Sequence, residues 1–123
     1  MSDISLVRLF RNAEGTRFAA GQTVIAEGTE GTTMYIVLEG DVEIRVGGAE
    51  LETVGPGSIF GEMALIDGGP RSAAVVAKTD CRVVEIDRRR FEFMVSETPY
   101  FALAVMKIMA DRLRKTNAKV AAN

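Results

Sequence analysis

Between residues 16 and 87, glycines divide the chain into short runs of β-branched and aromatic residues, and this pattern narrows the possible folds more than any other feature. Such runs suit antiparallel strands joined by tight turns. Residues 42–46 alternate apolar and charged side chains, as a strand with one buried face does. Gly47-Gly48 then predicts a hairpin turn, because both residues can adopt positive φ angles. The middle of the chain is therefore predicted to be an antiparallel β-sandwich or β-barrel.

Helical patterns flank this β region on both sides. The first ten residues are rich in apolar side chains and predict a short N-terminal helix. Residues 88–120 predict C-terminal helices, the longer of which begins at Thr98-Pro99, where threonine is a good N-cap and proline fits the first helical position. We expect one domain over residues 1–123, with a β-roll at about 16–87 and helices at about 88–120.

The longer C-terminal helix carries an apolar repeat that has two interpretations. Its members are Leu103, Met106, Ala110, Leu113, Asn117 and Val120. Their heptad spacing suits a seam against a second helix, with a polar asparagine at one inner position. The same residues could instead lay the helix on the β core, because so few heptads are weak support for a coiled coil. Both interpretations stay open from the sequence.

The chain contains no histidine and one cysteine, which removes most catalytic and metal chemistry. Ser-His and Cys-His nucleophile pairs, histidine-ligated metals and cupin-type metal enzymes all need histidine. Cys81 lies in an alternating apolar run, where a buried small side chain is the simplest interpretation. We therefore predict a binding protein that is not an enzyme and has no metal site or cofactor.

The hydropathy of the chain predicts a cytoplasmic protein. No run of about 18 apolar residues is present, so no membrane-spanning helix is expected. The sequence Met1-Ser2-Asp3-Ile4 lacks the basic and apolar regions of a signal peptide.

The segment from Phe60 to Ala74 carries the residues best suited to bind an anion. Gly61 permits a tight turn, after which Glu62–Leu65 can form one helical turn with free N–H groups at its start. Arg71 follows nine residues after Glu62, so its guanidinium can fold back toward the same N–H groups as a phosphate partner. Glu62 would repel a phosphate but could accept hydrogen bonds from sugar hydroxyls. Each residue alone has an ordinary structural explanation, whereas the combination predicts a nucleotide-type site.

At these residues the chain resembles the cyclic nucleotide-binding domain, and within it the sensor half of the catabolite activator protein group of bacterial regulators. The resemblance extends from about Phe10 to Val120 and includes the run Met34 to Gly40, the turn Val54-Gly55-Pro56-Gly57 and the segment described above. It implies a mainly β fold with flanking helices, built as an eight-stranded jelly-roll β-barrel.

The resemblance also implies a role for individual residues. Arg71 would pair with the cyclic phosphate, and Ser72 and Ala73 would add hydroxyl and N–H donors to it. Glu62 would accept a hydrogen bond from the ribose 2′-hydroxyl. The remaining implied positions are Gly61, Met63 and Ala64 beside the ribose and phosphate, Ile44 and Leu51 beside the base, and Thr116 and Asn117 opposite the exocyclic amine of adenine.

The function implied is that of a stand-alone cyclic nucleotide sensor. Cyclic AMP is the expected ligand, with cyclic GMP as the other candidate because a hydroxyl like that of Ser72 also occurs in guanine-preferring relatives. Ligand capture would reposition the Pro99–Val120 helix, which would pair in a homodimer or contact an effector protein. Activator relatives continue into a DNA-binding helix-turn-helix, which we do not find in these 123 residues. The alternative is a ligand-free protein-interaction or dimerisation module of the same fold.

Overall fold

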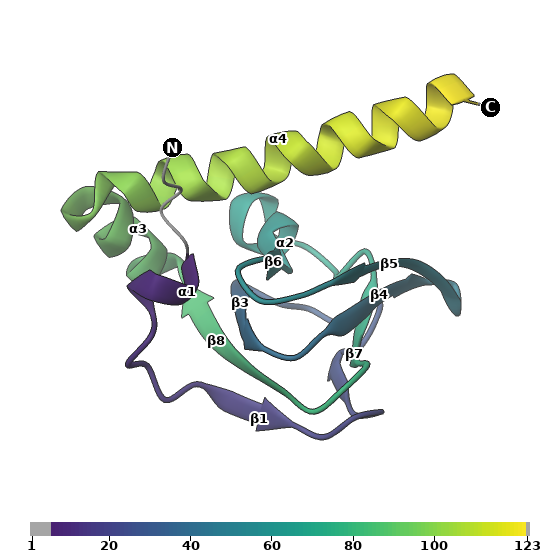
Figure 1. The fold of residues 1–123 in the computed structure, drawn as a ribbon, viewed down its shortest axis with the longest axis horizontal. Helices are drawn as coiled ribbons and strands as arrows, with labels where there is room; N and C mark the ends of the chain where they lie inside the picture. The colour runs from purple at the N-terminus through teal and green to yellow at the C-terminus, as the bar shows by residue number, and fades with distance from the viewer. Residues whose placement is uncertain (1–5, 123) are drawn as a thin grey trace.

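A computed structural model describes residues 6–122 of the chain, with side chains described as far as Ala118. The strands are β1 (Thr16–Phe18), β2 (Thr23–Ile25), β3 (Thr33–Glu39), β4 (Val42–Val46), β5 (Ala49–Val54), β6 (Ile59–Phe60), β7 (Ala74–Ala77) and β8 (Cys81–Asp87). The helices are α1 (Leu6–Leu9), α2 (Glu62–Asp67), α3 (Arg88–Glu97) and α4 (Pro99–Ala122). The β centre, the flanking helices and the start of the long helix at Pro99 are thus confirmed (Figure 1).

The strands form two antiparallel four-stranded sheets. One has the order β1-β8-β3-β6 and the other the order β2-β7-β4-β5. Within the described residues no ladder joins the two sheets, so the predicted closed barrel is not what the structure shows. The physical reason is the shortness of three edge strands, since β1, β2 and β6 have only three, three and two residues with which to bridge the gap. The jelly-roll connectivity stays a prediction.

Strand β3 is buried on both faces because it separates two hydrophobic layers. Met34 and Ile36 pack on the helix side, within the cluster that also contains Phe101 of α4. Val37 faces the second sheet, within the cluster that also contains Val75 of β7. The molecule therefore has three layers, with helices on one face of the first sheet and the second sheet on the other.

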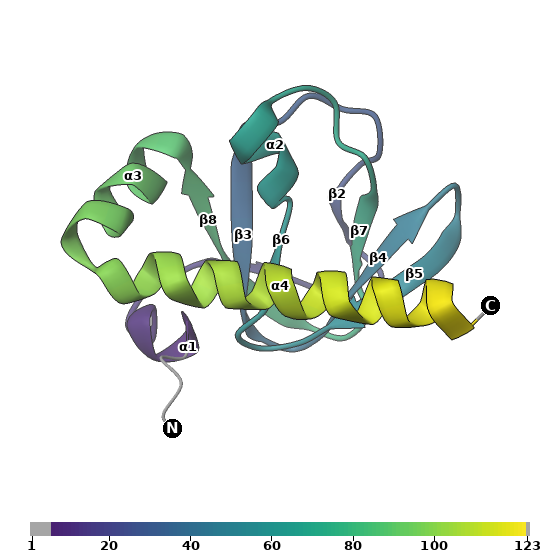
Figure 2. The same cartoon turned by 90° about the horizontal axis from the view of Figure 1, so that it is seen from above.

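Helix α4 crosses the top of the molecule and passes α2, as Figures 1 and 2 show from two directions. Phe101 and Val105 are buried and anchor the first half of α4 on the helix-side cluster. No single helix among residues 6–122 is long and apolar enough to cross a membrane, and α3 with residues 99–118 reaches that composition only as a pair bent by 115°.

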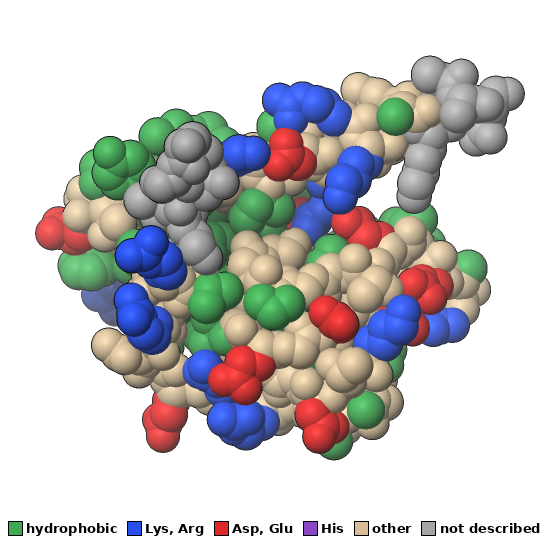
Figure 3. Space-filling model, in the orientation of Figure 1, with side chains coloured by type: hydrophobic (Ala, Val, Ile, Leu, Met, Phe, Trp, Pro, Cys, Tyr) green, Lys and Arg blue, Asp and Glu red, His purple; other side chains and the backbone are tan. Residues whose placement is uncertain are grey.

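The apolar repeat of α4 faces away from the core. Leu103, Met106 and Leu113 are 59%, 56% and 60% exposed, whereas Phe101 and Val105 form the buried stripe. Figure 3 shows hydrophobic side chains at the surface over α3 and the start of α4. The core-packing interpretation of the repeat is therefore wrong for these three leucine and methionine side chains. The side chain of Val120, which the repeat also includes, lies outside the described residues.

Candidate functional site

A cavity of about 500 Å³ lies between the β4–β5 hairpin, helix α2 and the segment that leads into β7. Arg112 of α4 lines its remaining side. The structure brings nine of the sequence-predicted site residues to its wall, namely Ile44, Leu51, Gly61, Glu62, Met63, Ala64, Arg71, Ser72 and Ala73. The volume suits a ligand of nucleotide size.

Arg71 is buried, with 8% of its surface exposed, and is the central cation of this cavity. Its Nη1 donates to the main-chain oxygens of Thr33 and Gly61 at 2.9 and 3.0 Å. Its Nη2 donates to the hydroxyl of Thr33 at 3.2 Å. Among the described residues, no carboxylate lies within 4.0 Å of the guanidinium, so its charge has no direct counter-ion.

Two of the five N–H donors of Arg71, on Nε and Nη2, have no acceptor among the described residues. A buried cation without a counter-ion carries a large desolvation cost, which an anionic ligand would offset. A phosphate matches this arrangement, because a guanidinium edge presents two parallel N–H groups to two oxygens.

Two glycines make room for the Arg71 side chain. A Cβ atom on Gly31 would lie 2.2 Å from the Nε atom of Arg71. A Cβ atom on Gly61 would lie 2.8 Å from its Nη1 atom, and Gly61 also has a φ of +76° that other residues rarely adopt. The loop is held by main-chain hydrogen bonds from Arg71 to Thr29 at 2.7 Å and from Gly28 to Arg71 at 2.9 Å. The main chain of Arg71 is therefore fixed by Thr29 and Gly28, and the two glycines leave room for its guanidinium.

Glu62 begins α2, as the predicted short helical turn requires, and its side chain is 12% exposed. Its Oε2 atom accepts a hydrogen bond from Nη1 of Arg112 at 3.2 Å. Its Oε1 atom is buried and has no hydrogen-bond partner among the described residues. Such an atom is costly to leave unpaired, and a hydroxyl donor from a ligand would satisfy it.

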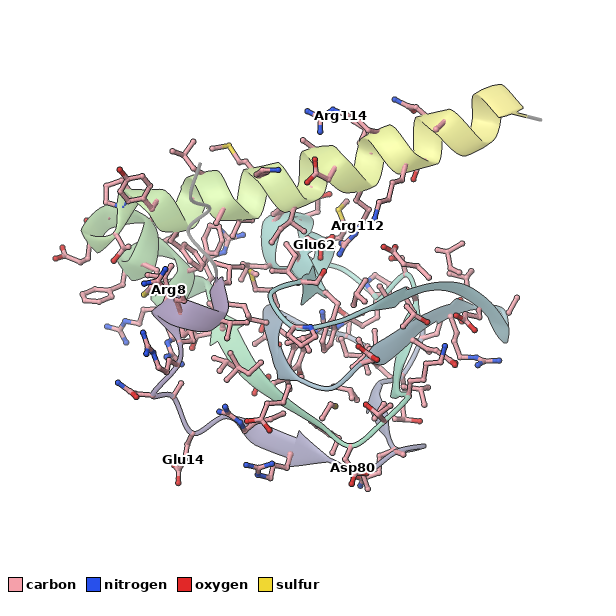
Figure 4. The ribbon with its side chains drawn as sticks, viewed as in Figure 1. Arg8, Glu14, Glu62, Asp80, Arg112 and Arg114 are labelled. Atoms are coloured by element: carbon pink, nitrogen blue, oxygen red, sulfur yellow. The ribbon has the colours of Figure 1, made fainter. Side chains whose placement is uncertain are left out.

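Arg112 closes the cavity from α4 and was missed by the sequence analysis. Figure 4 shows Arg112 and Glu62 pointing toward one another from α4 and α2. Arg112 also donates from Nη2 to the main-chain oxygen of Ile59 at 2.7 Å, and its Nε lies 3.8 Å from a carboxylate oxygen of Glu52. The signal that could have found it is the buried stripe Phe101, Val105, Ile108, which continues at helical spacing to residue 112.

The structure does not bring Thr116 and Asn117 to this cavity. Thr116 donates its hydroxyl to the main-chain oxygen of Arg112, one turn back on α4, at 3.1 Å. It lines a separate hollow of about 410 Å³ on the other side of Arg112. Asn117 is exposed. Helix register places Arg112, rather than these two residues, over the cavity, so their contact with a base stays a prediction.

The wall opposite α2 is formed by β4 and β5. A bulge between Ile44 and Arg45 pairs Ile44 with Glu52 and leaves Leu51 out of the ladder. Leu51 is 59% exposed and forms part of the rim, whereas Glu52, which the sequence analysis did not select, also lines the cavity. This apolar wall with charged neighbours suits a flat ring system better than a charged group.

Together, the two-sheet fold and this cavity are those of a small-ligand-binding module. Within residues 6–122, no cluster of three or more His, Cys, Asp or Glu side chains could hold a metal ion. The chain belongs to the cyclic nucleotide-binding domain family, which matches residues 16–98.

Named relatives agree with this family. The chain is 32% identical over 122 residues to the CRP-like cAMP-activated global transcriptional regulator of Mycobacterium tuberculosis, a match that covers 95% of this chain and 54% of the relative. It therefore spans about half the length of the curated relatives it matches.

Solved structures show the same similarity. The catabolite activator protein of Thermus thermophilus is 29% identical with a TM-score of 0.73, over 92% of this chain and 61% of that one. A structure described as "A cyclic-GMP-dependent signalling pathway regulates bacterial phytopathogenesis" is 30% identical with a TM-score of 0.67, over 100% of this chain and 98% of that one. The family and these neighbours support a cyclic nucleotide sensor.

Proposed function

We propose that this chain is a sensor module that binds a cyclic nucleotide, cyclic AMP in the first instance, in the cavity between α2 and Arg71. The observation that carries the proposal is the buried guanidinium of Arg71, which has two unused N–H donors and no carboxylate partner among the described residues. A cyclic phosphate is an anion of the right size and geometry to use both donors.

The rest of the ligand follows from the neighbouring groups. The phosphate would lie between Arg71, the hydroxyl of Ser72 and the main-chain N–H of Ala73, which all line the cavity. The ribose 2′-hydroxyl would donate to the unpaired Oε1 atom of Glu62. The base would then extend along the apolar wall at Ile44.

Adenine is the base that we propose for the ligand, with guanine as the second candidate. Adenine is supported by the cAMP-activated regulators of Mycobacterium tuberculosis, which share 32% identity with this chain. Guanine is the second candidate, supported by the neighbour from a cyclic-GMP-dependent pathway. Calorimetric titration with cyclic AMP, cyclic GMP and linear 5′-AMP tests both. We expect the cyclic AMP to bind most tightly, and failure of both cyclic nucleotides to bind would contradict the proposed function.

Glu62→Gln is expected to weaken cyclic AMP binding by about tenfold, because a hydrogen bond to a charged acceptor contributes about 1.5–3 kcal/mol. The 2′-deoxy analogue of cyclic AMP should lose a similar amount on the wild-type protein. It should lose less on the variant, since glutamine keeps an acceptor oxygen for the same hydrogen bond but lacks the charge that strengthens it. Calorimetry on both proteins with both ligands measures this coupling. Glu97→Gln, at an exposed position ending α3, is the control.

Tight binding of the 2′-deoxy analogue to the wild-type protein would contradict the role given to Glu62. If the loss of affinity from Glu62→Gln and the loss from the 2′-deoxy analogue simply add up, the ribose 2′-hydroxyl does not bind at Glu62.

The output of the sensor is proposed to pass through α4. Because Arg112 of α4 binds Glu62 directly, the β-roll and the C-terminal helix would act as one unit, and a ligand hydroxyl at Glu62 would alter the contact that holds α4. The exposed apolar repeat of α4, with Leu103, Met106 and Leu113, then offers a seam for a second copy of the chain. A homodimer is the proposed partner arrangement, and an effector protein on the same seam is the alternative.

Leu113→Glu is expected to convert the dimer to a monomer, because it places a charge in the middle of the apolar seam. Sedimentation velocity over a range of protein concentrations, with and without cyclic AMP, measures the change. Lys115→Glu, two residues further along the same exposed helix, is the control and should leave the dimer intact. A wild-type chain that stays monomeric at every concentration would contradict the homodimer.

A further inference from the structure

Thr33 holds the end of the Arg71 side chain with two of its own oxygen atoms. Its main-chain oxygen accepts from Nη1 at 2.9 Å, and its hydroxyl oxygen accepts from Nη2 at 3.2 Å. These two contacts occupy the terminal edge of the guanidinium. The unused donors on Nε and Nη2 therefore belong to the other edge, which is the pair that the proposed function assigns to phosphate.

The direction of the Thr33 hydroxyl is set by Glu85 of the neighbouring strand. A hydroxyl that accepts from Arg71 must direct its own hydrogen elsewhere, and Oε2 of Glu85 lies 3.1 Å away as the acceptor. The same carboxylate oxygen accepts from the hydroxyl of Tyr35 at 3.2 Å. Tyr35 and Glu85 are direct partners in the β3–β8 ladder, so backbone register places the carboxylate.

Tyr35 makes this arrangement rigid. Its ring stacks on Phe60, with centroids 4.9 Å apart and an interplanar angle of 7°, and the guanidinium carbon of Arg71 lies 6.0 Å from its centroid. Burial raises the pKa of Tyr35, and the Glu85 carboxylate acts in the same direction, so the phenol keeps the proton that it donates.

We propose that Thr33 is a positioning residue for the phosphate-binding arginine, with Glu85 directing the Thr33 hydroxyl. The consequence for ligand affinity rests on the proposed function, whereas the orientation of Arg71 does not. The negative charge of Glu85 reaches the buried guanidinium through a hydroxyl instead of a direct ion pair, so no carboxylate competes with phosphate for the free edge. Without the hydroxyl, Arg71 keeps only its Nη1 contacts, and the orientation of the Nε–Nη2 edge is no longer fixed.

The test compares Thr33→Val, which removes the hydroxyl at similar volume, with Thr33→Ser, which keeps it. The first readout is the Nε–H signal of Arg71 in a nitrogen–proton NMR spectrum of the protein without nucleotide, assigned by its loss in Arg71→Lys. The second is the dissociation constant for cyclic AMP by calorimetry. Thr16→Val, at an exposed threonine of β1, is the matched control.

We expect Thr33→Val to shift or broaden the Nε–H signal and to weaken cyclic AMP binding about tenfold, as loss of a hydrogen bond to a charged group does. Thr33→Ser should restore both readouts, and Thr16→Val should change neither. Thermal unfolding confirms that each variant is folded. Glu85→Ala should change the Nε–H signal in the same direction as Thr33→Val.

An Nε–H signal in Thr33→Val that overlays that of the wild-type protein would overturn the positioning role, whatever the ligand affinity. An unchanged signal in Glu85→Ala would overturn the part assigned to Glu85. If the signal responds as expected but the wild-type chain binds neither cyclic AMP nor cyclic GMP, the positioning role stands and the proposed function fails.

Discussion

Replacement of Arg71 with alanine is expected to weaken cyclic nucleotide binding by about 2–5 kcal/mol, which is about thirty-fold to several-thousand-fold in the dissociation constant. The guanidinium is 8% exposed and has no carboxylate within 4.0 Å among the described residues, so an anionic ligand would be its direct charge partner in the cavity. Truncation removes a charge-assisted pair between Arg71 and the phosphate. This pair is largely shielded from water, and Coulomb attraction is stronger in such a low-dielectric site than in water. Calorimetric titration with cyclic AMP measures the loss.

Arg71→Lys separates charge from geometry at the same position. Lysine keeps the positive charge but presents a compact ammonium instead of a bidentate guanidinium edge, so we expect an intermediate loss of cyclic AMP affinity. Arg17→Ala, at an exposed arginine whose nearest acid is Glu39 at 3.7 Å, is the control for general loss of positive charge. Affinity in Arg71→Ala equal to that of the wild-type protein would exclude this cavity as the binding site.

Phe101→Ala is expected to lower the free energy of unfolding by about 3–5 kcal/mol. Phe101 is fully buried, and its ring forms T-shaped pairs with those of Phe10 and Phe91, with centroids 6.2 and 5.4 Å apart. It thus joins α4 to α3 and to Phe10, which directly follows α1, and its removal would leave a cavity between these segments. Since domains of this size are stable by only about 5–15 kcal/mol, the loss is a large share of the total. Denaturation in urea, followed by circular dichroism, measures it.

Tyr100→Ala is the matched control for Phe101→Ala, because Tyr100 precedes it on the same helix and is 60% exposed. A change of at most about 0.5 kcal/mol is expected there. Equal losses in the two variants would mean that Phe101 does not anchor the helix. Loss of cyclic AMP binding in a folded Phe101→Ala protein would show in addition that the seating of α4 contributes to the cavity.

Local patterns in the sequence predicted the secondary structure well. The alternating run at 42–46 and the glycine pair after it became β4, the turn and β5, with φ angles of 59° and 84° at Gly47 and Gly48. The short helix after Gly61 became α2, and the long helix began at Pro99 as predicted. These features depend on residues within a few positions of each other, so period and turn chemistry are enough to predict them.

Features that depend on distant parts of the chain were not predictable in the same way. The eight strands were expected to close into a barrel, yet they form two separate sheets in the described residues because the edge strands are too short to join them. The face of α4 that meets the core could not be chosen from two overlapping apolar stripes. As a result, Thr116 and Asn117 were assigned to a cavity that Arg112 closes.

The sequence by itself determined the class of fold and the half of the candidate site that lies in one continuous segment. Gly61, Glu62 and Arg71 are within ten residues of each other, so local turn chemistry was enough to predict that they share a site. Only the tertiary structure decided the other half. Arg112 meets Glu62 across 50 residues, and Glu85 directs Thr33 across 52, because these contacts depend on how α4 crosses the β-roll and on strand register. Those arrangements arise from burial of the whole core, which no short window of sequence encodes.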